Sequence, residues 1–386
     1  MSATAVGDDT SPAAAMAGTA AAPIAAGAVE TVIGTNDRGE PVISVVVKRS
    51  YRLRSDGALE RAGHDEPLHR IDEYHDHGDP LWATVRHEAE LVAMKAAVDV
   101  VVIGRAHAPR GELVAEMGVA VRVGDRVRRL RVIGERQAFH RANGHPGFTE
   151  PTPFRTMDIR YEHAYGGVDE QSIPERPFHY PRNTHGCGVV TANSSEALDG
   201  LPLPTVEDPA DLLVPERLVL DDPADWPELP RPAGFGWLHR TWYPRCALLG
   251  AFPAWLAPGR QTAEEREGLL PADHVALAMQ YRLPTYRSRF ANGASRGLVF
   301  DRLADDAAIR LEGLHRDGTL AFALPGERPR VSLDIGGGAR ELLPKLDTVV
   351  VRPDELAVEL IWRAPFEIGD YGELSRLSRL RAEVDA

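Results

Sequence analysis

A chain of 386 residues, 43% hydrophobic and 26% charged, is long enough for one large domain or two modest ones with a substantial core. Its formal net charge of -13 argues against sequence-independent binding to nucleic acid or to an anionic membrane surface. The two cysteines, Cys187 and Cys246, are too few for a disulfide framework or a cysteine-rich zinc site, and they fit a reducing cytoplasm.

The N-terminal segment, residues 1–29, is rich in Ala, Gly, Thr and Pro. Asp8 and Asp9 precede its apolar part and no basic residue does, which is unlike a secretory signal. We expect this segment to be a disordered tail. Nowhere do about 18 apolar residues follow one another without a break, so the sequence predicts no membrane-spanning helix.

Two apolar runs rich in β-branched residues predict buried or half-buried strands. The first is residues 42–47, and the second is residues 98–103, which ends at Gly104. Asp99 lies inside the second run, and a buried carboxylate needs a hydrogen-bond partner. We therefore expect Asp99 to have a structural role.

Alternating apolar residues around short turns predict three β-hairpins. Gly124-Asp125 and Asp317-Gly318 are the turn signals of the first two. The hairpins join residues 119–123 to 126–133, 309–311 to 320–324, and 349–351 to 356–362. These ribbons predict a mainly β fold, with antiparallel sheets in a sandwich or barrel-like arrangement. The fold is expected over residues 30–366, either as one unit or as two subdomains, 30–145 and 146–366.

Helical patterns are fewer. Thr262 to Glu267 has the capping-box spacing of a short helix. A C-terminal helix is predicted over residues 367–386, where Leu374, Leu377, Leu380 and Val384 recur at roughly helical spacing. Between about residues 146 and 300 the chain is dense in Pro, Gly and aromatic residues, which predicts long ordered loops.

The most unusual stretch is residues 160–167, Arg-Tyr-Glu-His-Ala-Tyr-Gly-Gly, followed by Asp169. Gly166 and Gly167 allow a positive φ or a close approach of backbones. Tyr161 and Tyr165, four residues apart, are suited to anchor either a partner or a core. The stretch predicts a shaped turn, and Gly186 and Gly188, which flank Cys187, predict a second one.

Catalytic and metal-binding patterns are incomplete. A histidine cluster runs from His64 to His87, and its members are accompanied by several aspartates, but a His-Glu-x-x-His helix or a cysteine pair is missing. An exposed polar loop is the alternative to a metal site, and we expect no metal and no other cofactor. Residues 293–297 spell Gly-Ala-Ser-Arg-Gly, yet the strand and helix that flank a catalytic serine elbow are not predicted around them, so we expect a turn.

Several short segments occur in the same order as in a known bacterial family, from Lys95 to Arg363. They include residues 98–104, residues 132–136, Met157 through Gly167 with Asp169, Asn183 with Gly186 and Gly188, residues 232–236 with Trp242 and Arg245, and residues 346–348 with Trp362. The chain thereby resembles a domain of unknown function whose genes lie beside the PAAR-repeat and VgrG spike components of type VI secretion. His163 departs from that pattern, in which arginine is usual, and Thr184 stands where proline is common.

The resemblance implies a cytoplasmic adaptor or chaperone that holds a toxin effector, or its PAAR-containing carrier, until it is loaded on the VgrG spike. It implies no catalytic residues. Candidate residues for partner binding are Arg160, Tyr161, Glu162, Tyr165, Asp169, Trp237, Trp242 and Arg245. The alternative for the aromatic residues among them is that they fill the core.

Two other functions remain open at the level of the sequence. One is a hydrolase or carbohydrate-acting enzyme that uses Glu162 and Asp169 as paired carboxylates beside the Gly166-Gly167 turn. The other is a structural accessory of the secretion apparatus that touches the spike without recognising an effector.

Overall fold

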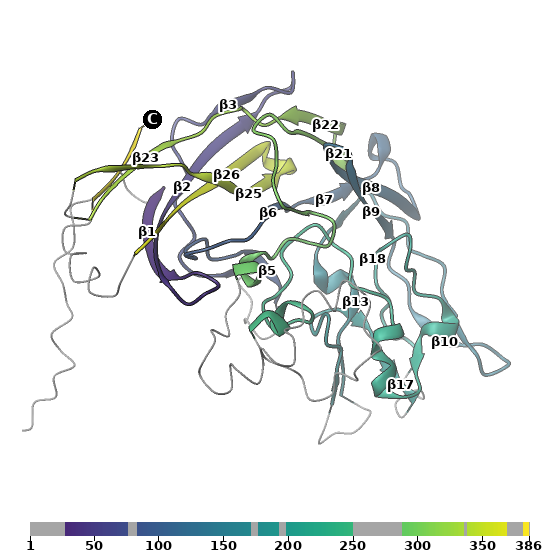
Figure 1. Ribbon diagram of the computed structural model, residues 1–386. Coiled ribbons are helices and arrows are strands. Elements are labelled where there is room, and N and C mark those ends of the chain that lie inside the picture. Colours follow the sequence, from purple (N-terminus) through teal and green to yellow (C-terminus); the bar gives the residue numbers. More distant parts are fainter. Residues whose placement is uncertain are drawn as a thin grey trace, which may run out of the picture.

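The computed structural model describes residues 28–75, 83–170, 177–192, 198–249, 288–335, 338–368 and 381–385. In this part of the chain strands dominate and the helical segments are short 3₁₀ turns, so the predicted mainly β class is confirmed. Most long strands gather in two sheets, and a lobe of loops, whose core is formed by side chains between Ala138 and Cys246, lies beside them (Figure 1). No described helix is long and apolar enough to cross a bilayer.

The two ends of the chain differ from expectation. Strand β1 (Val29–Thr35) begins at the last residue of the predicted tail, and residues 1–27 lie outside the described part. The predicted C-terminal helix is wrong at its end, because Arg381–Asp385 form strand β27. Residues 369–380, like the predicted helix at 262–267, lie outside the described residues.

The error at β27 has a physical reason. The strand pairs antiparallel with β23 (Arg330–Asp334), whose edge supplies backbone hydrogen-bond partners. Ala382 is buried and Glu383 is exposed, which is the alternation of a strand. Leu380 and Val384, four residues apart, satisfy a helical pattern and a strand pattern equally over so short a stretch.

The first sheet has seven strands. Its order is β1, β2 (Pro41–Leu53), β26 (Ala357–Glu367), β25 (Lys345–Arg352), β6 (Val98–Val102) and β20 (Val299–Phe300), with β3 (Leu59–Arg61) on β2. β25 and β6 run parallel, and every other neighbouring pair is antiparallel. The sheet is therefore mixed, and it contains the predicted strands at 42–47 and 98–103 and the hairpin that ends at Trp362.

The second sheet has five strands and is antiparallel. Its order is β18 (Val206–Glu207), β9 (Arg126–Ile133), β8 (Glu116–Val123), β21 (Ala308–His315) and β22 (Gly318–Ala323). Both predicted hairpins are present: Val123 pairs with Arg126 around Gly124-Asp125, and His315 pairs with Gly318, which places the second turn at Arg316-Asp317, one residue before the predicted Asp317-Gly318. A small third sheet joins β23 to β27 and to β24 (Arg340–Leu342).

One hydrophobic core lies between the two large sheets. It combines side chains of the first sheet, such as Val100 and Leu360, with side chains of the second, such as Val121 and Leu311. Each of these is almost fully excluded from solvent. Burying one aliphatic side chain of this size contributes roughly 1.5–3 kcal/mol, so the alternating pattern of the strands accounts for a stable sandwich. The third sheet packs on other residues of the first, in a smaller cluster.

Outside the three sheets, the described chain forms only short strands and 3₁₀ turns. The short strands are β4 (Glu73–Tyr74), β5 (Val85–His87), β7 (Arg105–His107), β10 (Ala138–His140), β11 (Pro146–Phe148), β12 (Thr156–Asp158), β13 (Tyr165–Gly166), β14 (Val168–Asp169), β15 (Phe178–His179), β16 (Cys187–Gly188), β17 (Val190–Thr191) and β19 (Val219–Leu220). Those from β10 onward, except β12, lie in the lobe. The 3₁₀ turns are η3 (Pro109–Gly111), η4 (Tyr161–His163), η6 (Pro215–Arg217), η7 (Pro223–Glu228), η8 (Arg245–Leu249), η9 (Ser288–Ala291) and η10 (Pro353–Glu355).

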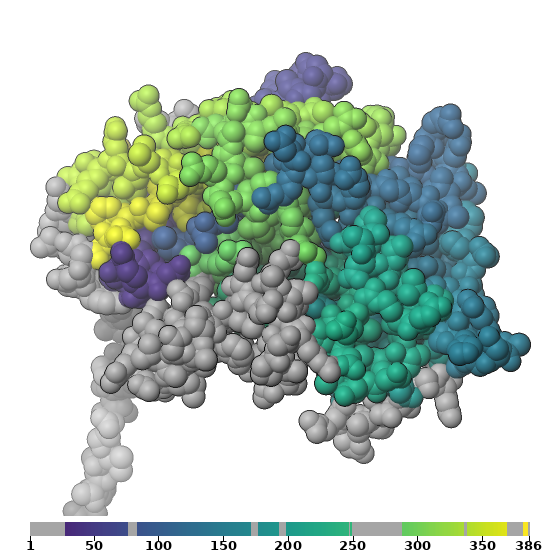
Figure 2. Space-filling model, turned by 45° about the vertical axis from the view of Figure 1, so that its right-hand side comes forward, coloured from purple at the N-terminus to yellow at the C-terminus, as the bar shows by residue number. Residues whose placement is uncertain are grey.

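The lobe has an aromatic core of its own. Tyr165 meets Tyr180 edge to face with ring centroids 5.3 Å apart, and Trp226 meets Tyr243 in the same way at 5.4 Å. Such pairs add about 0.5–1.5 kcal/mol beyond the burial of their surface. In the space-filling view the teal residues of the lobe form one mass beside the green C-terminal sheets (Figure 2).

Asp99 connects the sandwich to the neighbouring loops. It is fully buried in β6 and forms an ion pair with Lys95 at 2.8 Å. Its carboxylate also accepts hydrogen bonds from the Asn292 side chain at 3.1 Å and from the Gly293 backbone N–H at 3.0 Å. The expected partners of Asp99 are thus present, and they fix the chain at residues 292–293 against the sheet.

Candidate functional site: an arginine-lined pocket

The stretch at 160–167 is a tight turn inside the lobe. It forms η4 and then β13, which pairs in parallel with β16. Gly166 has φ 152° and Gly167 has φ 110°. A Cβ on Gly166 would lie 2.2 Å from the carbonyl oxygen of Asn183, so no larger residue fits without moving the backbone. The glycines therefore permit two backbone segments to pass in direct contact.

Asn183 holds this turn together. It is fully buried, and its side-chain amide donates to the carbonyl oxygens of Tyr161 at 2.8 Å and Tyr165 at 3.2 Å. Its own carbonyl oxygen accepts from the Gly167 N–H at 2.8 Å. Sequence reasoning assigned no role to Asn183 beyond the family pattern, because one asparagine in a loop gives no local sign of a clamp.

Most of the predicted partner-binding residues lie in the interior. Six of the eight are buried: Tyr161, Tyr165, Asp169, Trp237, Trp242 and Arg245. Tyr161 packs edge to face on Trp242 with centroids 5.4 Å apart, and the Trp242 indole N–H donates to the Thr184 hydroxyl at 3.2 Å. In this structure the aromatic residues fill the core, as the alternative interpretation held, and they shape the surface above them.

The charged residues of the stretch hold neighbouring segments in place. Glu162 accepts hydrogen bonds from the backbone N–H of Thr84 at 2.8 Å and from its hydroxyl at 2.6 Å. Asp169 accepts from the backbone N–H of Thr191 at 2.8 Å. Arg160 pairs with Asp158 at 2.7 Å. Glu162 and Asp169 are thus each engaged by a different segment of the chain.

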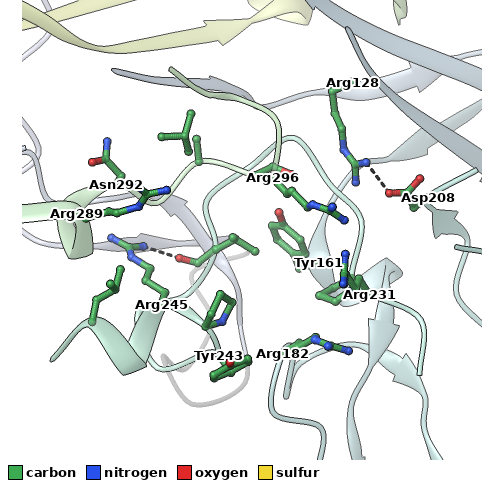
Figure 3. Close-up of a pocket in the computed structure, with 17 residues that line it drawn as sticks. Arg128, Tyr161, Arg182, Asp208, Arg231, Tyr243, Arg245, Arg289, Asn292 and Arg296 are labelled. Carbon is green, nitrogen blue, oxygen red and sulfur yellow. Dashed lines mark hydrogen bonds and ion pairs between the residues drawn. The ribbon is translucent and has the colours of Figure 1, made fainter. Parts of the chain in front are cut away.

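Directly beside Tyr161 lies a pocket of about 230 Å³. Among the described residues, six arginines and one carboxylate contribute to its wall: Arg128, Arg182, Arg231, Arg245, Arg289, Arg296 and Asp208. Apolar side chains, including Leu238, Leu248 and Val299, line the remainder. In the view of Figure 3, Arg296, Arg231 and Arg182 lie on one side of the Tyr161 ring, and Arg245 and Arg289 lie on the other.

Three of these arginines are held by contacts that fix their direction. Arg245 forms a two-pronged ion pair with Glu88 and donates to the carbonyl oxygens of Leu238 and Phe290. Arg128 pairs with Asp208 at 2.6 Å. Arg182 lies 4.7 Å from the centre of the Trp226 ring, a cation–π contact. Fixed guanidinium groups lose little conformational entropy when they bind a ligand.

The segment from Asn292 to Arg296 forms one wall of the pocket. Asp99 holds its start, and the Ser295 hydroxyl donates to the carbonyl oxygen of Gly234 at 2.6 Å. Ser295 is followed by β20 at Val299. The structure thus shows a turn that leads into a strand, in agreement with the expectation, and the serine hydroxyl is used in packing.

Burial moves the pKa values of two reactive groups of the region further above neutral pH. It raises the pKa of the Tyr161 hydroxyl to about 12. It also raises the pKa of the Cys187 thiol to about 12. A thiol with so high a pKa carries little of the thiolate that nucleophilic catalysis requires.

The histidine cluster is divided in the structure. His69 and His87 stack with centroids 4.4 Å apart, whereas His77 lies outside the described residues. His69 takes part in two groups with three potential metal-ligand atoms within 4.8 Å, one with Glu73 and His87 and one with Glu90 and Glu359.

A lysine occupies the second of these groups. The ammonium group of Lys48, fully buried, lies 2.8 Å from Glu90 and 3.4 Å from Glu359. This ammonium pairs with both carboxylates, and the Arg352 guanidinium supplies a second positive charge to Glu359. The residues of the second group therefore fit a buried ion-pair network better than a metal centre.

The arginine pocket was not predicted as a unit. Tyr161 and Arg245 were singled out for other reasons, and the remaining arginines are scattered from Arg128 to Arg296. The feature of the sequence that could have indicated the pocket was the recurrence of single arginines in an acidic chain. Only the fold shows that they face one cavity.

Residues 38–363 match the model of the DUF2169 family, described as an uncharacterized protein conserved in bacteria. The match covers the strands of both large sheets from β2 onward, the lobe and the residues of the pocket. No curated protein and no solved structure matches the chain. The protein therefore belongs to the DUF2169 family of bacterial proteins.

Proposed function

We propose that this protein is a cytoplasmic adaptor or chaperone that binds a toxin effector, or its PAAR-type carrier, and assists its loading onto the VgrG spike of a type VI secretion system. The resemblance of the sequence to the known bacterial family supports type VI secretion as the system and a toxin or PAAR-type protein as the partner. The pocket supplies a chemistry for binding.

The observation that carries the proposal is the arginine-lined pocket. Guanidinium groups form paired hydrogen bonds with carboxylates, and protein interfaces are enriched in Arg, Tyr and Trp. Here six arginines share one cavity in a chain whose net charge is -13. The combination of guanidinium groups and apolar walls suits a segment of polypeptide, which brings charged and apolar side chains together.

The contacts of the other candidate reactive groups favour binding over turnover. Glu162 and Asp169 accept hydrogen bonds from Thr84 and Thr191, and Ser295 donates to a backbone carbonyl. An acid–base pair or an activated nucleophile needs its reactive atoms directed at a substrate. The engagement of these groups in packing supports a scaffold whose rigid lobe presents the pocket.

Co-purification tests the proposal. The full chain carrying an affinity tag is expressed together with the toxin and PAAR-type proteins encoded by neighbouring genes, and the retained proteins are identified by mass spectrometry. We expect one of them to be retained, and we expect its secretion to stop in a strain that lacks the adaptor gene. Unchanged secretion in that strain, together with no retained partner, would refute the proposal.

A matched control separates binding from catalysis. Glu162→Gln and Asp169→Asn together remove both carboxylates that the enzyme alternative uses. If the double variant retains the partner and restores secretion, the carboxylates have no catalytic role in loading. Loss of a measurable hydrolytic activity in the same variant, with folding intact, would support the enzyme instead.

A further inference from the structure

The arginine pocket continues into a second hollow. The two share Asp208, Arg231 and Arg296 among their lining residues, and the second has a volume of about 310 Å³. Because the shared residues border both spaces, the pocket and the hollow adjoin, and we call the two together the arginine groove. Two adjoining spaces offer more room for an extended chain than a compact ion uses.

The charge changes along the arginine groove. The pocket end carries Arg128, Arg182, Arg245, Arg289 and the shared pair Arg231 and Arg296. The hollow adds one arginine, Arg217, and two carboxylates, Asp211 and Glu228. Arg217 pairs with Asp211 at 2.8 Å and donates to the carbonyl oxygen of Glu228 at 2.6 Å. Among the described lining residues, arginines therefore outnumber carboxylates at the pocket end, where Asp208 is the carboxylate, and the two kinds of residue are balanced in the hollow.

From these features we infer that the arginine groove binds an extended segment of a partner polypeptide in which acidic residues alternate with apolar ones. The acidic side chains occupy the pocket end, where each carboxylate meets a guanidinium group. The apolar side chains pack on Leu238, Leu248 and Val299. This inference rests on the proposed function and adds the chemistry of the segment that the adaptor recognises.

The lining of the pocket favours a peptide over a small inorganic anion. A phosphate ion is surrounded by hydrogen-bond donors and gains nothing from an apolar wall. A segment with alternating side chains places successive residues on opposite sides, so it uses both kinds of surface at once. The groove also spans two adjoining hollows, whereas one phosphate fills a small part of either.

A peptide-binding experiment on the full chain tests the inference. Fluorescein-labelled peptides of about eight residues, which extend to about 27 Å, alternate leucine with glutamate, glutamine or lysine. Fluorescence anisotropy measures their dissociation constants. We expect the Leu–Glu peptide to bind at least about tenfold more tightly than the Leu–Gln peptide, and the Leu–Lys peptide more weakly still. Equal affinities for the Leu–Glu and Leu–Gln peptides would overturn the inference.

Substitutions locate the binding site. Arg231→Gln with Arg296→Gln removes both shared guanidinium groups, and we expect binding of the Leu–Glu peptide to weaken about tenfold or more. Arg310→Gln is the control, because Arg310 lies on β21 outside the groove and pairs with Glu312 at 2.8 Å. An unchanged affinity in a double variant that melts like the wild type would contradict the inference.

Two further measurements on the wild type do not depend on how the variants fold. A Leu–Glu peptide with one benzophenone side chain should crosslink to residues that line the groove, and crosslinks confined to the edge strand β22 would overturn the inference. Inorganic phosphate should fail to displace the peptide at about 1 mM, where ionic screening is still modest. Complete displacement would mark a phosphate site instead.

The result of the peptide-binding experiment can be distinguished from the result of the co-purification experiment that tests the proposed function. If the toxin or its carrier co-purifies with the chain while no acidic peptide binds, the adaptor proposal stands and the groove inference fails. If neither the partner nor the peptide is retained, both fail.

Discussion

The two large sheets and the lobe obtain buried interiors by different means. In the sheets, aliphatic side chains at alternate positions, such as Val100 and Leu360, fill one shared core. In the lobe, aromatic rings meet edge to face, and the backbone is fixed by glycines and by Asn183. The sheets therefore tolerate many changes among hydrophobic residues of similar volume, whereas the lobe depends on single residues at fixed positions.

The aliphatic interior of the first sheet also contains buried ion pairs, and the pairs of Lys48 give the largest expected effect. Replacing Lys48 by Met leaves the carboxylates of Glu90 and Glu359 without their shared ammonium partner. Breaking a buried ion pair in this way costs about 3–5 kcal/mol. Urea unfolding followed by tryptophan fluorescence measures the loss. Adding Glu90→Gln should recover much of the lost stability, because Glu359 keeps its ion pair with Arg352, and failure to do so would show that packing of the lysine stem is responsible.

In the lobe, the substitution Gly166→Ala should lower the stability of the fold, as Lys48→Met does in the sheet. The new Cβ would lie 2.2 Å from the Asn183 carbonyl oxygen, and φ 152° is unfavourable for alanine. We expect a loss of about 3 kcal/mol. Gly124→Ala is the matched control, since Gly124 also has positive φ but nothing lies within 4 Å of its added Cβ. Its cost should be about 1 kcal/mol, and equal costs for the two variants would contradict the close backbone approach.

The contrast between these regions also determines what the sequence could predict. Alternation and two-residue turns are local, so both hairpins were predicted, although the turn of the second lies at Arg316-Asp317, one residue before the predicted Asp317-Gly318. The parallel pairing of β6 with β25 was missed, because it joins strands that are far apart in the chain. Contacts such as Arg245 with Glu88 are equally distant in sequence. The arginine groove consists of such contacts, so it became visible only in the fold.

The pH dependence of stability offers a third comparison. Burial and the neighbouring His185 lower the pKa of His239, at the edge of the lobe, from 6.5 to about 4. Between these values the unfolded chain binds the proton and the folded chain does not, so stability falls as pH drops below about 6.5. The contribution is at most about 1.4 kcal/mol per pH unit, and less because His239 is only half-buried. His239→Asn should flatten this part of the curve in urea unfolding between pH 4.5 and 7.5, and an unaltered slope would refute the assignment.

The smallest expected effect belongs to Glu162→Gln. The glutamine oxygen can still accept from the Thr84 N–H, so we expect a loss of about 1 kcal/mol in stability. Thermal unfolding measures this change. Partner retention in the co-purification experiment should stay at the wild-type level, which would distinguish a packing role from a role in recognition.

The most direct measurement of the central claim compares partner affinity with and without the groove arginines. The toxin or PAAR-type protein encoded nearby is titrated against the full wild-type chain and against the Arg231→Gln, Arg296→Gln variant. An adaptor that uses the arginine groove predicts tight binding to the wild type and at least about tenfold weaker binding to the variant at a temperature where thermal unfolding shows both proteins to be folded. Equal binding to both proteins, or binding to neither, would contradict the account.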